Sequence, residues 1–259
     1  MNLPFSKQQF FEVFAAYNEA VWPMPLWLLN LAVLAVLAVL WRWRLSDGIV
    51  SVVLGLLWLW SGVMYHLVFF RPVNPAALLF WALFIVQSAA LFRCGLGRKG
   101  LHFTAPRNEP RTLVGGLVIT YALVIYPLIG RAFGHSYPFA PTFGAPCPVV
   151  LFTFGLLFWT DAGRPRWLLI IPLTWALVGS SAVIAFGMYE DIALPITGLY
   201  AAVVLLPRRG TNGDTRRQER SAAAGARREE DGDGVVNVGR NASRTNATGT
   251  SRSTTRWLS

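Results

Sequence analysis

Long apolar runs separated by short polar breaks fill the first 206 residues of the chain. The approximate bounds of the seven runs are 25–41, 48–70, 75–92, 112–133, 148–160, 167–187 and 192–206. A helix rises about 1.5 Å per residue, so about 20 apolar residues cross the roughly 30 Å hydrocarbon core of a bilayer. The runs are too long for strands and do not alternate as half-buried strands do. The pattern therefore predicts an all-α polytopic transmembrane bundle of about seven spans in residues 1–206.

A shorter amphipathic stretch precedes the first run. Ser6 and Gln9 have the spacing of a helix capping box, and Phe10 and Phe14 begin a series of apolar residues at helical spacing. We expect a short helix over residues 6–20 that lies on the outer membrane interface.

Composition and charge add an orientation to this picture. Hydrophobic residues make up 54% of the chain and charged residues only 14%, against roughly 25% charged in soluble domains. Despite this, the net charge is +10, and the basic residues gather after the odd-numbered runs. They are Arg42, Arg44, Arg93, Arg98, Lys99, Arg107, Arg111, Arg164, Arg166, Arg208 and Arg209. The opposite breaks hold only Lys7, Arg71 and Arg131. Since Lys and Arg near helix ends favour the cytoplasmic side, we expect the N-terminus outside and the C-terminus inside.

Residues 207–259 differ from the rest of the chain. They are rich in Arg, Gly, Ser, Thr and Asn and have no apolar periodicity. Such a segment buries too little surface to offset its ordering entropy, so we expect a disordered cytoplasmic tail. Its arginines allow contact with anionic lipid, whereas the interleaved acidic residues argue against a nucleic-acid partner.

Polar residues gather at the predicted outer ends of the spans. They are Tyr65, His66, Asn74, His135, Tyr137, Cys147, Glu190 and Asp191. The predicted topology brings them into one extracytoplasmic layer, which makes them candidates for binding a ligand. Imidazole and thiolate groups suit zinc or copper, which makes His66, His135 and Cys147 weak metal candidates. Cys147, flanked by prolines, also has the chemistry of a haem ligand. Because these residues come from separate segments without a ligand-spacing motif, we predict no metal and no other cofactor.

Several motifs around these residues resemble one family. They are Trp58-x-Trp60-x-Gly62-x2-Tyr65-His66, Asn74-Pro75-Ala76, Gly134-His135-x-Tyr137-Pro138-x2-Pro141-Thr142-Phe143-Gly144-x-Pro146-Cys147-Pro148 and Pro172-x2-Trp175. With them, residues 3–206 resemble bacterial multi-pass membrane proteins grouped as domain of unknown function 6064. The resemblance implies a bacterial inner-membrane location and supplies no reaction, substrate or catalytic residue. Residues 207–259 have no counterpart in that family.

Three classes of function follow from these patterns. The first is binding or transport of a small molecule or ion through the outer polar layer. The second is a non-enzymatic membrane subunit or scaffold, in a homo-oligomer or a larger complex, that acts by helix–helix contacts. A membrane-embedded enzyme ranks last, because the sequence contains no H-E-x-x-H, P-loop, C-x-x-C or G-x-S-x-G motif.

Overall fold

The computed structural model describes residues 4–97, 100–161 and 165–206. The predicted disordered tail at 207–259 lies outside the described residues, as do Arg98, Lys99 and Arg164. The helices are α1 (Lys7–Val21), α2 (Met24–Leu40), α3 (Ser46–Trp60), η1 (Ser61–Phe70), α4 (Ala77–Leu96), α5 (Pro110–Thr120), η2 (Tyr121–Ile125), α6 (Tyr126–Ala132), α7 (Pro146–Phe158), η3 (Arg166–Leu169), α8 (Ile170–Phe186), η4 (Tyr189–Ile192) and α9 (Ala193–Leu205). Of these, η1 and η2 are π-helices that continue the preceding α-helix, and η3 and η4 are 3₁₀ turns. Each predicted apolar run is helical, and no strand occurs in the described ranges.

Several helices are long and apolar enough to cross a membrane. Four meet both conditions alone, namely Ser46–Phe70, Ala77–Gly95, Pro110–Ala132 and Arg166–Phe186. A fifth is obtained if α1 and α2, which meet at a bend of 83°, are counted as one span. The central helix α7 is apolar but shorter. These lengths are consistent with a membrane protein, while the number of seven crossings stays a prediction.

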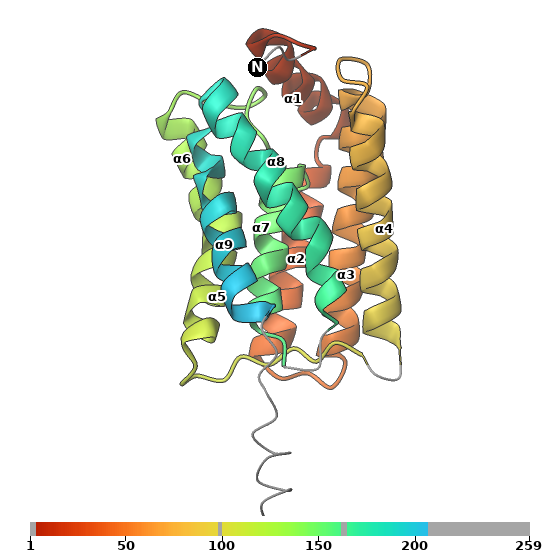
Figure 1. Cartoon of the computed structure of the whole chain (residues 1–259), viewed down its shortest axis with the longest axis vertical. Helices are drawn as coiled ribbons and strands as arrows, with labels where there is room; N and C mark the ends of the chain where they lie inside the picture. The colour runs from red at the N-terminus through yellow and green to blue at the C-terminus, as the bar shows by residue number, and fades with distance from the viewer. Residues whose placement is uncertain (1–3, 98–99, 162–164, 207–259) are drawn as a thin grey trace, which may run out of the picture. The chain divides into compact units, whose positions relative to one another are not determined.

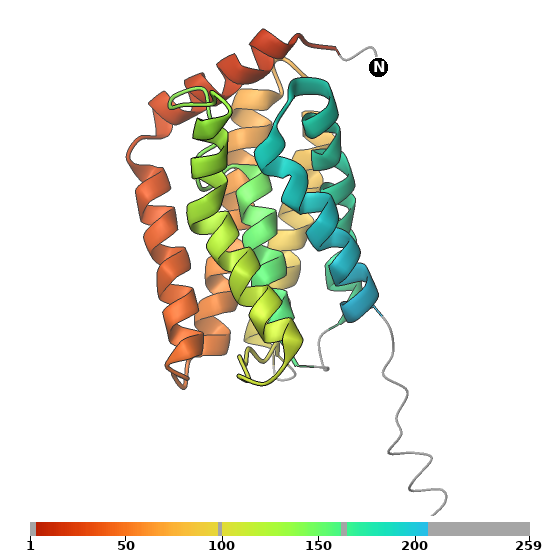
Figure 2. The same ribbon diagram turned by 90° about the vertical axis from the view of Figure 1, so that its left-hand side faces the viewer.

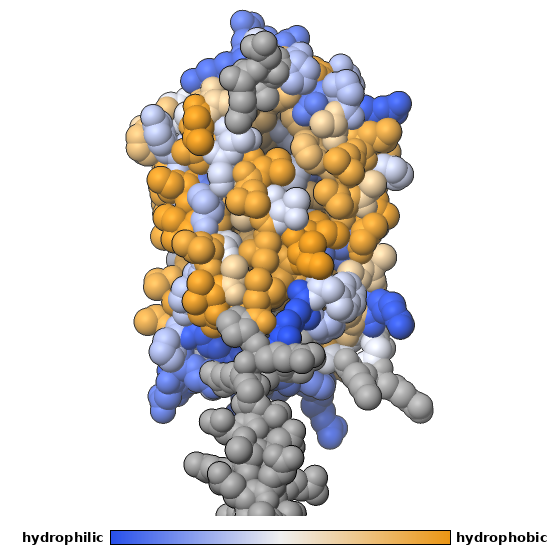
Figure 3. Space-filling view, in the orientation of Figure 1, coloured by the Kyte–Doolittle hydropathy of each residue, from blue (hydrophilic) through white to orange (hydrophobic). Residues whose placement is uncertain are grey.

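Within residues 4–206 the helices run up and down beside one another, and α1 lies across one end of them (Figures 1 and 2). On the face drawn in Figure 3, apolar residues occupy the middle and hydrophilic residues gather toward both ends. The most exposed apolar side chains include Leu177 and Ile184 of α8, which are 76% and 86% exposed. Such exposure is expected of side chains that face lipid.

The loops after α2 and α4, which carry Arg42, Arg44 and Arg107, lie at the end opposite α1, and we call this the basic end (Figures 1 and 2). The Asp47 carboxylate accepts hydrogen bonds from the Phe103 amide at 2.8 Å and contacts His102 Nδ1 at 2.9 Å. Arg111 Nη1 donates to the carbonyl oxygen of Thr160 at 2.6 Å. These contacts join the start of α3 to the loop before α5, and the start of α5 to the segment after α7. At the other end, α1 meets the loop between α6 and α7, and we call this the α1 end.

Helix α7 forms the centre of the bundle. Every one of its residues except Cys147 is buried. Small residues let its neighbours approach closely, since a Cβ on Gly155 would lie 3.1 Å from the carbonyl oxygen of Gly115 on α5. A buried hydrogen bond joins α3 to α7, in which Trp58 Nε1 donates to Thr153 Oγ1 at 2.9 Å.

Helix α1 begins with the predicted capping box, in which Ser6 Oγ accepts from the Gln9 amide at 3.2 Å and Gln9 Oε1 accepts from the Ser6 amide at 2.8 Å. Its apolar side chains pack on other helices of the protein: the ring centroids of Phe10 and Phe186 are 4.3 Å apart. Helical spacing shows that one face of a helix is covered, but it does not show whether protein or lipid covers it. The apolar side of α1 faces other helices of the protein. Its position on the membrane interface stays a prediction.

Candidate functional site

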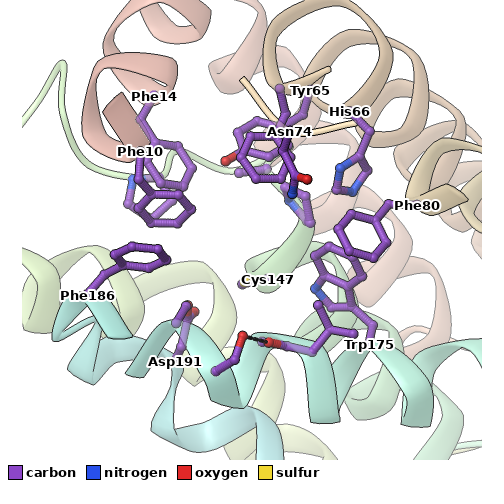
Figure 4. Close-up of a pocket in the computed structure, with 18 of the residues that line it drawn as sticks. Phe10, Phe14, Tyr65, His66, Asn74, Phe80, Cys147, Trp175, Phe186 and Asp191 are labelled. Atoms are coloured by element: carbon purple, nitrogen blue, oxygen red, sulfur yellow. Dashed lines mark hydrogen bonds between the residues drawn. The ribbon is translucent and has the colours of Figure 1, made fainter. Parts of the chain in front are cut away.

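A cavity of about 290 Å³ lies beneath α1 (Figure 4). We call it the aromatic cavity, because its walls are mainly rings from α1 and the residues just before it, η1, α4 and α8. These rings are Phe5, Phe10, Phe14, Tyr65, Phe70, Phe80, Trp175 and Phe186. The bend between α1 and α2 turns α1 over the bundle, which brings its phenylalanines to the end of α8.

Part of the predicted polar layer lines this cavity. Its members there are Tyr65, His66, Asn74, Cys147 and Asp191. They come from η1, the loop before α4, the start of α7 and the turn η4. The structure thus brings together residues that are separated by as many as 126 positions in the sequence, from Tyr65 to Asp191.

The His66 imidazole is the least satisfied polar group of the cavity wall. It is 0% exposed, and neither ring nitrogen has a hydrogen-bond partner among the residues that the structure describes. Rings surround it, with the centroid of Phe84 at 4.7 Å and that of Trp175 at 5.0 Å. A buried polar group without a partner costs about 1–3 kcal/mol, so a partner supplied from the cavity would stabilise this arrangement.

Asp191 places a carboxyl group in the same cavity. It lies in the turn η4 between α8 and α9 and is 1% exposed. The Tyr126 hydroxyl donates a hydrogen bond to its Oδ1 at 2.6 Å, and the Cys147 thiol lies beside it. Burial raises the pKa of Asp191 to about 7, although the bond from Tyr126 acts in the opposite direction. Near neutral pH this carboxyl group therefore exchanges between a neutral and an anionic form.

The remaining candidates lie outside the aromatic cavity. Glu190, which is 0% exposed, contacts His135 Nδ1 through Oε1 at 3.0 Å. The ring centroid of Phe11 lies 4.9 Å from that of His135, so this pair packs beneath α1. His135 and Tyr137 line a second hollow of about 380 Å³. Glu190 and Asp191 are adjacent in sequence, but Glu190 pairs with His135 whereas Asp191 lines the aromatic cavity.

The three weak metal candidates do not share one site. His66 lies among rings, His135 pairs with Glu190, and Cys147 lies beside Asp191. No group of three or more His, Cys, Asp or Glu side chains in residues 4–97, 100–161 and 165–206 is arranged to hold a metal ion.

Sequence reasoning missed how α1 is fastened over the cavity. Asn18 is fully buried, and its Nδ2 donates to the carbonyl oxygens of Pro138 at 2.5 Å and Ala140 at 2.7 Å. Thr142 Oγ1 donates to Asn18 Oδ1 at 2.6 Å. A polar residue within an apolar helical face was the available signal for Asn18. Nothing local in the sequence marked Tyr126 as a partner of Asp191.

Comparison with known proteins gives a family without an assigned activity. A family model described as "Family of unknown function (DUF6064)" matches residues 7–216, so residues 207–216, for which the sequence predicted no counterpart in the family, are matched as well. No curated protein and no solved structure matches the chain. The matched range includes Tyr65, His66, Asn74, Cys147 and Asp191, so the polar lining of the aromatic cavity belongs to the family region.

Proposed function

Because this chain belongs to DUF6064, a family of unknown function, we propose from its geometry that it is a membrane protein that binds a small, largely apolar molecule in the aromatic cavity. The observation that carries the proposal is the buried His66 imidazole without a partner on the wall of a 290 Å³ ring-lined cavity. Small-molecule sites are typically concave and mostly apolar, with a few polar groups that orient the ligand.

The proposed location is the bacterial inner membrane, with seven spans, the N-terminus outside and the C-terminus inside. The arginines at the basic end support this orientation, because cytoplasmic loops carry an excess of Lys and Arg. The α1 end then lies on the extracytoplasmic side, so the aromatic cavity takes its ligand from there or from the outer leaflet.

Packing beneath the cavity favours binding over a continuous path through the bundle. His66 contacts the ring of Phe84, whose centroid lies 4.4 Å from that of Trp58. Phe84, Trp58 and Phe152 are all 0% exposed. We interpret this packing as a floor beneath the cavity, because buried rings in a densely packed interior leave little free space.

Cys147 offers a direct test of binding, because it lines the cavity and only one other cysteine, Cys94, is present. In the Cys94→Ser variant, reconstituted in nanodiscs, the rate of Cys147 alkylation by N-ethylmaleimide is measured with and without 2-phenylethanol. At about ten times its Kd the probe should slow alkylation by about tenfold, because it occupies most sites. The same probe should also raise the temperature of unfolding.

Three variants control this experiment. Cys147→Ala leaves Cys94, whose alkylation should not respond to the probe. Ala182→Phe fills part of the cavity and should abolish protection, whereas Ala132→Phe on the exposed side of α6 should retain it. If no aromatic probe of this size, neutral or charged, protects Cys147 or stabilises the folded protein, the proposed function is wrong.

A further inference from the structure

We propose that the ligand of the aromatic cavity is an organic cation, a protonated amine whose ammonium group lies at Asp191. The inference rests on the proposed function and specifies the chemical class of its ligand. Three features of the cavity carry it: the sign of its charge, the nature of its walls and the unpartnered imidazole.

Asp191 is the one carboxyl group among the described residues that line the cavity, and that lining includes neither Lys nor Arg. The nearby Lys7 ammonium lies 5.8 Å from the centroid of the Phe11 ring and does not line the cavity. An anionic ligand would therefore meet a like charge without a compensating cation. An ammonium group would neutralise the buried carboxylate, which is otherwise costly in an apolar site.

The walls suit a cation for a second reason. The face of an aromatic ring attracts a cation that lies within about 6 Å of its centroid, and cages of several rings recognise ammonium groups. On the side of the cavity near Asp191, Phe186 stacks on Phe10 with an interplanar angle of 14° (Figure 4). An ammonium group at Asp191 would thus lie next to rings from both α1 and α8.

His66 supplies a second polar contact away from Asp191. In Figure 4 the imidazole and the Asp191 carboxyl group lie on different sides of the cavity, and rings line the space around them. Both imidazole nitrogens lack partners among the described residues. A ligand that carries a hydrogen-bonding group at the end opposite its amine would satisfy one of them, so the site favours an amphipathic amine over a simple ammonium ion.

The titration of Asp191 gives this proposal a pH dependence. Several titratable groups lie close to Asp191, and they are Tyr65, Tyr121, Tyr126, Cys147 and the adjacent Glu190. His135 contacts Glu190 in turn. Burial raises the pKa of Asp191 to about 7, so the fraction of the anionic form increases from about one tenth at pH 6 to about nine tenths at pH 8. The affinity for a cation should rise with pH over this interval, whereas the affinity for a neutral molecule should not.

The test compares three probes of similar size, namely 2-phenylethylamine, 2-phenylethanol and 3-phenylpropionate. Binding to the full chain in nanodiscs is measured by calorimetry at pH 6 and pH 8. We expect the amine to bind about tenfold more tightly than the alcohol at pH 8, and its affinity to fall about tenfold at pH 6. The propionate should bind most weakly.

Two variants separate the carboxylate from the rest of the site. Asp191→Asn should remove the advantage of the amine over the alcohol, so that the affinity for the amine no longer varies between pH 6 and pH 8. If Asp191→Asn does not fold, Tyr126→Phe takes its place: it removes the hydrogen bond that stabilises the anion and should move the rise in amine affinity to higher pH. An amine affinity that neither exceeds that of the alcohol nor varies with pH would overturn the inference but leave the proposed function intact. Tightest binding of the propionate would overturn it as well, and failure of all three probes would reject the proposed function itself.

Discussion

At the scale of single residues, Asp191 couples the stability of the fold to pH. Its ordinary pKa is 3.8, and burial raises the pKa to about 7 in the folded protein. Between these values the unfolded chain has lost the proton that the folded chain retains, so a rise in pH favours unfolding. The pH-dependent contribution of Asp191 to the free energy of unfolding is therefore fully present below about pH 4. It decreases as the pH rises and is lost above about pH 7.

Equilibrium unfolding in mixed micelles from pH 4 to pH 8 measures this effect. The difference in the free energy of unfolding between wild type and Asp191→Asn should decrease by up to about 1.4 kcal/mol per pH unit and level off above about pH 7. Glu19→Gln, at an exposed position of α1, should keep the pH dependence of the wild type. A difference that stays constant would show that Asp191 titrates as an exposed carboxyl group does, and one that increases with pH would show that folding lowers its pKa.

At the scale of elements, α1 covers the aromatic cavity and is fastened by Asn18. Asn18→Ala removes three hydrogen bonds to the loop between α6 and α7. Loss of buried hydrogen bonds costs about 1–3 kcal/mol, and about 1.4 kcal/mol shifts an opening equilibrium tenfold. In the Cys94→Ser background we therefore expect Cys147 to react with N-ethylmaleimide about tenfold faster.

The matched change on the same helix is Gln8→Ala. The Gln8 amide lies on the exposed side and donates only to Glu12, at 2.8 Å, within α1. Its removal should leave the reactivity of Cys147 unchanged. Equal rates in Asn18→Ala and Gln8→Ala would mean that α1 does not limit access to the cavity.

The same elements show what the sequence could and could not predict. The runs of apolar residues gave the helices, because hydrophobic length and periodicity are local properties. The capping box at Ser6 is local as well. The contact of Asn18 with Ala140 joins residues 122 positions apart, so it leaves no local pattern. The π-helix η1 carries Tyr65 and His66 on the cavity wall. Its residues form part of an apolar run that predicts an ordinary α-helix, so nothing in the sequence indicated the π-helix either.

At the scale of the whole bundle, the polar residues lie at two ends: arginines at the basic end and the candidate site residues at the α1 end. The alternation of basic loops predicted this division, since helices joined by short loops place alternate loops at the same end. The sequence also predicted that the candidate residues lie at one end. It did not predict which of them share a site: His135 and Glu190 pair beside the aromatic cavity, while Asp191 enters it. Consecutive side chains point in different directions, and the element that receives each of them is set by tertiary packing.

The orientation of the bundle can be tested with one pair of cysteines. In a Cys94→Ser, Cys147→Ser background, Ser136→Cys places a thiol on an exposed residue of the α1 end and Asn108→Cys places one on an exposed residue of the basic end. Only the helical segment Pro110–Ala132, which is long and apolar enough to cross a membrane, separates the two positions. In intact spheroplasts a membrane-impermeant maleimide should label Ser136→Cys, and it should label Asn108→Cys only after permeabilisation. Labelling of Asn108→Cys alone would invert the orientation, and with it the side from which the cavity takes its ligand. Labelling of both thiols in intact spheroplasts would show that Pro110–Ala132 does not cross the membrane.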